Sequence, residues 1–170
     1  VLMALDEKYN LTTDQQIDYL FVAAIFGLVI ANNASISGAM GGCQAEIGSA
    51  SAMAAAATVY VLGGTPEESA EAMAITIKNM LGLICDPVAG LVEVPCVKRN
   101  ALGATQALVS SDMALAGITS RISPDDVIAA MDEVGNVMPY IFKETAQGGL
   151  ATTKGAQEIE AQIAKQSIED

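Results

Sequence analysis

Two short helix-start signals constrain the fold of this chain more than any other feature. Residues 65–68 (TPEE) and 123–126 (SPDD) each place a hydroxyl residue, a proline and two acidic residues in succession. The hydroxyl caps free N–H groups, proline fits the first helical position, and acidic side chains complement the helix dipole. The first signal predicts a helix to about Leu81, and the second predicts a helix to about Val137.

Most of the remaining segments also carry helical patterns. Residues 46–62 are small and apolar throughout, which is typical of a buried, closely packed helix that ends at Gly63-Gly64. Thr13 and Gln16 have the spacing of a capping box, which predicts a helix that continues to about Ala31. Further helices are expected over three ranges, 98–116, 139–145 and 156–166. Residues 85–95 contain two prolines and a glycine, so a structured loop is expected there, with an extended stretch over 91–94.

No segment shows a strand pattern long enough to build a sheet, and no internal repeat or linker divides the chain. The bulk comes from Ala, Leu, Ile, Val and eight methionines, with no tryptophan, a composition that favours packed helices over sandwich strands. A length of 170 residues is typical of one domain. We therefore predict a single compact all-α domain over residues 1–170, with about six or seven helices.

Charge and hydropathy exclude some partners. Acidic residues outnumber basic ones by 20 to 8, for a net charge of −12, which argues against nucleic-acid and anionic-membrane partners. The longest apolar run covers residues 19–31 and is shorter than the roughly 20 residues of a membrane span, so it predicts a buried core helix. The first residues lack the basic start of a signal peptide. A soluble, cytoplasmic chain is expected.

Three cysteines carry most of the functional information. Cys43, Cys85 and Cys96 each lie near a glycine or proline, in loops at the boundaries of the expected helices. An odd number fits poorly with a disulfide framework, and a reducing cytosol would leave the thiols free. The chain contains no histidine, which excludes histidine-based triads and histidine-containing metal sites.

The spacing of the cysteines leaves two interpretations open. It contains no Cys-x-x-Cys pair, so zinc and dithiol redox sites fit poorly. Three thiolates do suit an iron-sulfur cluster in which one iron lacks a protein ligand. Spacing alone favours three inert buried cysteines. The neighbouring residues favour a functional role: the cysteines lie beside Gly41-Gly42, Asp86-Pro87 and Pro95, where core packing alone gives little reason for a cysteine.

Three segments resemble a known family. Residues 42–46 (GCQAE), 85–100 (CDPVAGLVEVPCVKRN) and 144–151 (ETAQGGLA) are similar to the α chain of the iron-sulfur-dependent L-serine dehydratases, and the resemblance extends from about residue 1 to residue 151. It implies an oxygen-labile 4Fe-4S cluster bound by Cys43, Cys85 and Cys96, with one iron open to substrate. The implied activity is that of an L-serine ammonia-lyase of the hydro-lyase type, which forms pyruvate and ammonia without pyridoxal phosphate in amino-acid degradation and gluconeogenesis.

The resemblance also implies partners. The family's α chain has a long upstream segment and works with a β domain or β subunit, so this chain is expected to be the cluster-binding part of a longer α chain within an oligomer. Whether the isolated chain is active is left open. Met40 stands where the family commonly has an acidic residue, and the sequence after Ala151 departs from the family's usual ending.

The reaction requires groups that bind the substrate and move a proton. An open iron can act as Lewis acid on the serine hydroxyl, and a base must take the Cα proton. Arg99, with Lys98 beside it, is a candidate for the substrate carboxylate because a guanidinium matches that group in two-point geometry. A solvated helix start is the alternative. Glu46 and Glu93 are candidates for binding the ammonium or accepting a proton, although solvation or helix capping explains either equally well.

No residue is selected as the general base. Two other functions remain open. One is a related iron-sulfur cysteine desulfidase, in which iron would accept a thiol sulfur instead of a hydroxyl. The other is a non-catalytic helical partner subunit without metal.

Overall fold

Helices make up most of the chain. A computed structural model describes residues 1–169, with side chains through residue 166. Over these residues it contains eight α-helices: α1 Leu2–Tyr9, α2 Thr13–Asn33, α3 Gly38–Gly41, α4 Ser49–Val61, α5 Pro66–Met80, α6 Cys96–Leu115, α7 Pro124–Val137 and α8 Lys154–Glu169. Four short η helices lie between them: η1 Gln44–Gly48, η2 Val88–Gly90, η3 Tyr140–Phe142 and η4 Gly149–Thr152. The prediction of an all-α domain is confirmed, with α1 and α3 as short helices that the pattern did not indicate.

The two helix-start signals act as predicted. The Thr65 hydroxyl accepts a hydrogen bond from the Glu68 N–H, and the Glu68 carboxylate accepts one from the Thr65 N–H. The Ser123 hydroxyl caps α7 by accepting a hydrogen bond from the Asp126 N–H, and it donates one to the Asp126 carboxylate. The predicted capping box of α2 was wrong by one residue, because Thr12 pairs with Gln15. Local hydrogen bonding at these starts fixes where α5 and α7 begin.

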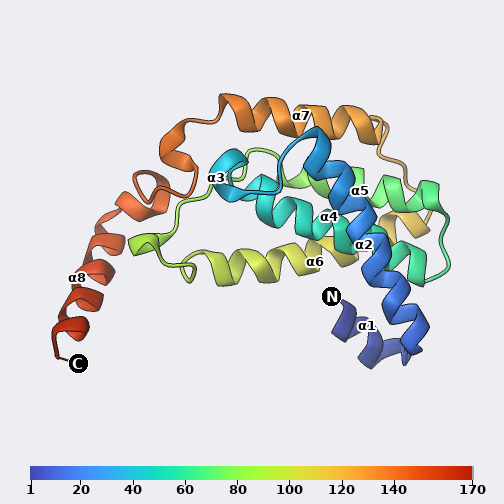
Figure 1. Cartoon of the computed structure of the whole chain (residues 1–170), viewed down its shortest axis with the longest axis horizontal. Helices are drawn as coiled ribbons and strands as arrows, with labels where there is room; N and C mark the ends of the chain where they lie inside the picture. Colours follow the sequence, from blue (N-terminus) through green and yellow to red (C-terminus); the bar gives the residue numbers. More distant parts are fainter. Residues whose placement is uncertain (170) are drawn as a thin grey trace.

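Helix α4 forms the centre of the molecule. It packs against α2, α5 and α6, with α7 along one edge and α6 along the other (Figure 1). Its small residues allow this crowding, since Ala52, Ala55 and Ala56 are fully buried. A Cβ on Gly103 of α6 would lie 2.6 Å from the Ser51 hydroxyl of α4. The α4–α6 crossing therefore depends on the absence of a side chain at Gly103.

Helix α2 differs from its prediction. It is long and apolar enough to cross a membrane by length and composition, yet only 17% of its most apolar stretch is buried in the fold. Tyr19 and Ile30 face the core, whereas Phe21 and Leu28 are more than half exposed. The prediction of a buried core helix was therefore wrong for most of α2. A helix that is apolar all round does not reveal which of its faces the fold covers.

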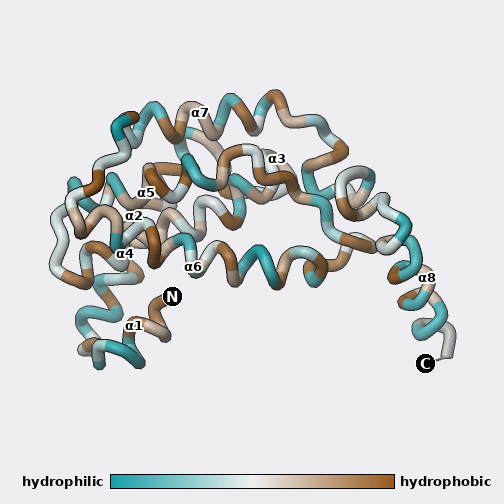
Figure 2. The backbone as a smooth tube through the Cα atoms, turned by 180° about the vertical axis from the view of Figure 1, so that it is seen from behind, coloured by the Kyte–Doolittle hydropathy of each residue, from teal (hydrophilic) through white to brown (hydrophobic). Residues whose placement is uncertain are grey.

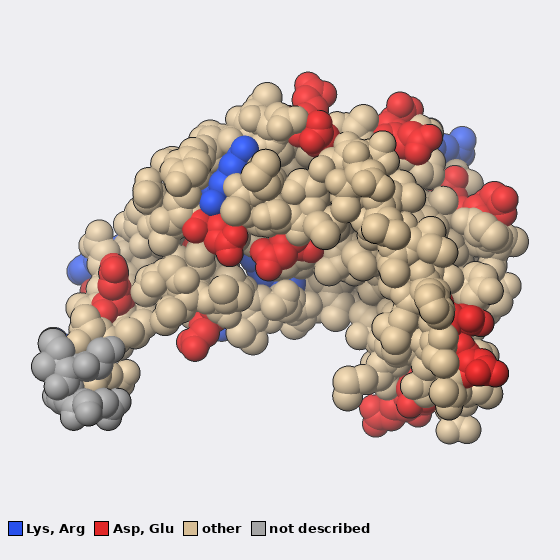
Figure 3. All heavy atoms as spheres, viewed as in Figure 1, with Lys and Arg blue, Asp and Glu red and all other residues tan. Residues whose placement is uncertain are grey.

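The charged residues of the chain are mostly acidic, and the outer helix α7 has both polar and apolar residues. Helix α7 alternates hydrophilic and hydrophobic turns (Figure 2) and buries Val127, Ile128 and Met131. Acidic side chains are spread across the face in Figure 3, with basic ones sparse. Helices α1 and α8 lie at opposite ends of the molecule (Figure 1).

The loop before α6 positions the cysteine region. It lies at the end of α6 nearest α8, and α8 contacts η2. The predicted extended stretch over 91–94 was wrong, because residues 92–95 form a turn. The helix predicted over 139–145 is only the short η3. The Val88 N–H donates to the Val94 carbonyl and the Glu93 N–H donates to the Leu91 carbonyl, so hydrogen bonds within the loop favour a turn over an extended stretch.

Candidate functional site

Three chain segments bring the cysteines to one cavity. Cys43 directly precedes η1, Cys85 lies in the loop after α5, and Cys96 is the first residue of α6. All three are buried, with 1%, 3% and 7% of their surface exposed. The cavity is also lined by a second set of residues: Glu46, Ile47, Pro87, Val92, Asn100 and Glu144. The structure therefore gathers every cysteine of the chain at one place.

The backbone around Cys43 is fixed by a glycine and a hydrogen bond. Gly42 has φ 76° and ψ −176°, a conformation open essentially to glycine alone. A Cβ there would lie 2.6 Å from the Met138 sulfur and 2.9 Å from the Leu83 carbonyl oxygen. The same carbonyl accepts a hydrogen bond of 2.9 Å from the Gln44 N–H. The turn that presents Cys43 thus requires Gly42.

Cys85 is held by a distant segment of the chain. Its N–H donates to the Phe142 carbonyl at 2.8 Å, and its carbonyl accepts from the Glu144 N–H at 2.9 Å. These bonds form an isolated parallel bridge with Lys143. Glu144 adopts φ 63°, a value that is uncommon for residues other than glycine. The bridge carries the Glu144 carboxylate to the cysteine cavity.

The thiols and carboxylates are close enough to share a bound group. The sulfurs of Cys43 and Cys85 and a Glu46 carboxylate oxygen lie within 4.8 Å of one another. Cys96 lines the same cavity but lies outside that group. Metal–thiolate bonds of about 2.3 Å limit two sulfurs on one ion to about 4.6 Å apart. A group larger than one ion, such as a cluster, suits all three sulfurs better.

Burial changes the acidity of the thiols. It raises the pKa of Cys43 and of Cys96 above the usual range. Burial also strongly raises the pKa of Cys85, and the neighbouring Cys43 adds to the effect. The thiols are therefore protonated at neutral pH in the absence of a bound cation. Metal binding must release these protons, so it is favoured by higher pH.

The cavity is small, and its lining includes the exposed Glu46, Val92 and Asn100. It has room for about 20 Å³, which is the space of about one water molecule. A neighbouring cavity of about 300 Å³ shares Ile47 and Asn100 with it. The three thiols are the donors that an iron-sulfur cluster requires, so the donor set fits such a group. A cluster is larger than this volume, so its binding requires side chains around the cavity to move outward.

Gly38 lies where the site groups converge. A Cβ on this residue would lie 2.7 Å from a Glu46 carboxylate oxygen. It would also lie 3.4 Å from both the Cys85 sulfur and a Glu144 carboxylate oxygen. The missing side chain therefore leaves the space that these groups share.

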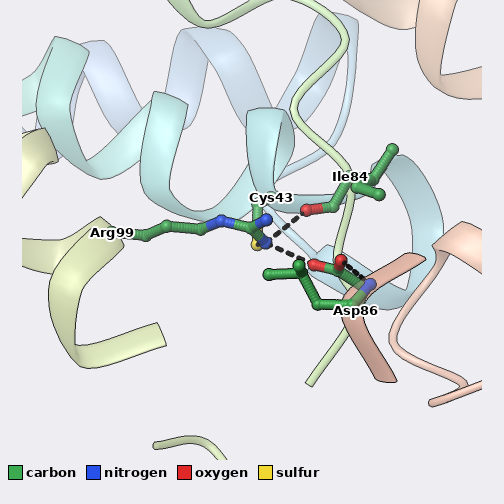
Figure 4. Close-up of polar contacts among 5 residues, drawn as sticks. Cys43, Ile84, Asp86 and Arg99 are labelled. Atoms are coloured by element: carbon green, nitrogen blue, oxygen red, sulfur yellow. Dashed lines mark hydrogen bonds and ion pairs between the residues drawn. The ribbon is translucent and has the colours of Figure 1, made fainter. Parts of the chain in front are cut away.

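Arg99 has partners within the protein. Its Nη1 donates to Asp86 Oδ1 at 2.6 Å and to the Ile84 carbonyl at 2.8 Å, and it lies 3.8 Å from the Cys43 sulfur (Figure 4). Burial lowers the pKa of Arg99, but Asp86 and, to a smaller extent, Cys43 together outweigh that effect and raise the pKa above its usual value. The structure thus pairs Arg99 with the protein's own carboxylate, where the sequence predicted a substrate carboxylate.

The other predicted site residues divide into two groups. Glu46 lines the cysteine cavity, whereas Glu93 and Lys98 are exposed and do not line it. Sequence reasoning missed Asn100 and Glu144 as cavity residues. Asn100 lies four residues after Cys96 on α6, so helical spacing places both on one face. Glu144 reaches the cavity through the backbone bridge between Lys143 and Cys85. No pattern in the neighbouring sequence predicts that bridge.

These observations define a class of protein: an all-α chain in which buried thiols from three segments form a candidate metal centre. The family model of the serine dehydratase alpha chain matches residues 1–151, and the chain belongs to this family.

Three relatives are similar over nearly the whole chain. The probable L-serine dehydratase alpha chain of Bacillus subtilis is 67% identical over 162 residues, covering 95% of this chain and 54% of the relative. That of Latilactobacillus sakei is 53% identical over 168 residues, covering 99% of this chain and 80% of the relative. The L-serine dehydratase alpha chain of Peptoniphilus asaccharolyticus is 49% identical over 166 residues, covering 98% of this chain and 57% of the relative. The chain thus spans little more than half the length of the Bacillus and Peptoniphilus relatives.

Proposed function

We propose that this chain is the cluster-binding part of an L-serine dehydratase α chain, which deaminates L-serine to pyruvate and ammonia. The observation that carries the proposal is the convergence of the buried Cys43, Cys85 and Cys96 on one cavity. Membership of the serine dehydratase alpha-chain family supports the choice of substrate.

The cysteines would hold a 4Fe-4S cluster, and no pyridoxal phosphate would be needed. When bound, such a cluster with one open iron supplies a Lewis acid for the serine hydroxyl. Three thiolate ligands leave that position available, whereas a fourth cysteine would occupy it. Burial of the thiols beside the apolar, buried Ile47 would limit the access of water to the bound group.

Charged side chains at the cavity would bind the rest of the substrate. Glu46 and Glu144 both present carboxylates beside Gly38, which suits the α-ammonium group of an amino acid. Asn100 offers an amide that can donate to the substrate carboxylate. Either glutamate would be able to accept the Cα proton from a substrate bound at the cavity, so both are candidates for the base. Lys98 and Glu93 would contribute only in contact with a partner or with substrate, since they do not line the cavity.

We further propose a cytoplasmic assembly with a β domain or subunit. Relatives are named as alpha chains, which supports a partner chain. The assembled α–β enzyme, in oligomeric form, would then be the active species.

Anaerobic assay of the assembled enzyme tests the proposal. The α chain is co-purified with its β partner, reconstituted with iron and sulfide, and assayed for pyruvate from L-serine. We expect activity that the Cys43→Ser, Cys85→Ser, Cys96→Ser triple variant lacks, and that a carbonyl reagent against pyridoxal phosphate leaves unchanged. Iron uptake without pyruvate would sink the proposed reaction.

The same assay separates the two alternatives. Release of sulfide from L-cysteine, with no turnover of L-serine, would identify a cysteine desulfidase. A chain that takes up no iron beyond the triple variant would be a helical partner subunit instead.

A further inference from the structure

One guanidinium connects the three cysteine-bearing segments. Arg99 follows Cys96 by three residues on α6, so the two share a helix face. Its Nη1 contacts both neighbours of Cys85, at the Ile84 carbonyl and the Asp86 carboxylate. The same nitrogen lies 3.8 Å from the Cys43 sulfur. Figure 4 shows these groups pointing toward one another.

Asp86 extends the connection to a fourth segment. Its side chain is 1% exposed, and Oδ2 accepts a hydrogen bond of 2.7 Å from the Leu150 N–H. The adjacent Gly149 has φ 61°, and a Cβ there would clash with the Asp86 carboxylate. The segment around residue 149 is therefore shaped to receive Asp86. A buried carboxylate of this kind depends on its partners, because an unpaired buried charge is strongly unfavourable.

We propose that Arg99 and Asp86 are positioning residues for the three cysteines. Their ion pair holds Cys43, Cys85 and Cys96 at one cavity, and the Arg99 N–H contributes a positive partner to the Cys43 thiolate when metal is bound. The proposal deepens the proposed function, because it rests on the cysteines serving as ligands. It replaces the predicted role of Arg99 as a substrate-carboxylate ligand.

Chemistry favours this role over a purely structural ion pair. Metal-bound thiolates carry negative charge, and hydrogen bonds and positive charge near the sulfurs raise the reduction potential of a cluster. Groups that support ligands from behind typically change metal affinity by about 10- to 100-fold when removed. A structural ion pair would change folding stability without changing the potential of a bound cluster.

Cd²⁺ titration of the metal-free chain provides the test, read by thiolate-to-metal ultraviolet absorption. We expect Arg99→Gln and Asp86→Asn to weaken Cd²⁺ binding about 10- to 100-fold while retaining the helical circular dichroism spectrum. Arg99→Lys should recover part of the loss, because it keeps the charge but not the planar fork. Arg121→Gln is the matched control, since Arg121 is the chain's other arginine and is exposed.

A second measurement reports on the charge directly. After reconstitution with iron and sulfide, Arg99→Gln should shift the cluster's reduction potential to more negative values, and Arg121→Gln should not. If either single variant is unfolded, the double variant Asp86→Asn/Arg99→Gln replaces it, because neither charge is then buried alone. Wild-type affinity and potential in the folded variants would overturn the proposal.

The outcomes separate this inference from the proposed function. Tight Cd²⁺ binding that depends on Arg99, with no iron-sulfide assembly, supports the positioning role and contradicts the cluster. Cluster assembly that is indifferent to Arg99 and Asp86 contradicts only the positioning role. A wild-type chain that binds no Cd²⁺ through its thiolates overturns both.

Discussion

Replacing Gly42 with alanine tests how the backbone presents Cys43. Its φ of 76° and ψ of −176° place an alanine in a region that costs about 1–3 kcal/mol. The added Cβ would also lie 2.6 Å from the Met138 sulfur and 2.9 Å from the Leu83 carbonyl oxygen. Methionine can move, but that carbonyl also binds the Gln44 N–H. Overpacking of this kind costs about 1–3 kcal/mol.

The two effects together predict a loss of about 2–6 kcal/mol in the free energy of unfolding. Urea unfolding of the metal-free chain, followed by circular dichroism, measures this loss. Gly117→Ala is the matched control, because Gly117 has a similar φ of 80° and nothing lies within 4 Å of its added Cβ. The control should lose only about 1–2 kcal/mol, the cost of a left-handed backbone alone.

The same variant should also lose function. Gly42 directly precedes Cys43, so relief of the clash must displace the thiol from the cavity. We expect reduced iron uptake in Gly42→Ala and unchanged uptake in Gly117→Ala. Equal losses of stability in the two variants, or full iron uptake by Gly42→Ala, would refute the reasoning.

Three other predictions use the same metal-free chain. Burial raises the pKa of the three thiols in the folded chain. Above about pH 8.5 the unfolded chain therefore loses thiol protons that the folded chain keeps. The free energy of unfolding should then fall as the pH rises further, by at most about 1.4 kcal/mol per pH unit for each thiol. Urea titrations between pH 7.5 and 10 should show this slope in the wild type, and a triple Cys→Ser variant with the same slope would contradict it. Gln44→Leu removes the side-chain partner of the Met131 carbonyl and of the Gly82 N–H. Only the bond to Met131 is fully buried, and its loss should cost about 1–3 kcal/mol; an unchanged Tm argues against these bonds. Phe21→Ser, on the exposed face of α2, should change stability by no more than about 0.5 kcal/mol, and a loss above about 2 kcal/mol would show that this face is buried.

Helix starts could be predicted because their signals are local. Thr65 and Ser123 bond to N–H groups three residues away, so neighbouring residues in the sequence suffice to find them. Burial is a property of the whole fold, and this explains the error at α2. The apolar residues of α2 indicate a helix, but they do not show which face packs against α4. Phe21 lies on a face that remains exposed.

The candidate site could be predicted in part for the same reason. The residues around Cys43, Cys85 and Cys96 indicated that these side chains act together, and the structure places them at one cavity. The pairing of Arg99 with Asp86 could not be predicted, because the charge of Arg99 is visible in the sequence but its partner depends on how the loop folds back. Glu144 was missed because it reaches the cavity through a bridge between segments almost sixty residues apart.

The central claim is that three cysteines hold one iron-sulfur cluster with an open iron for serine. Mössbauer spectroscopy of the ⁵⁷Fe-reconstituted α–β enzyme, recorded with and without L-serine, tests it most directly. The account predicts about four irons per chain, of which one changes its signal when L-serine binds, with no such signal in the triple Cys→Ser variant. Iron bound equally by that variant, or a spectrum that L-serine leaves unchanged, would contradict the account.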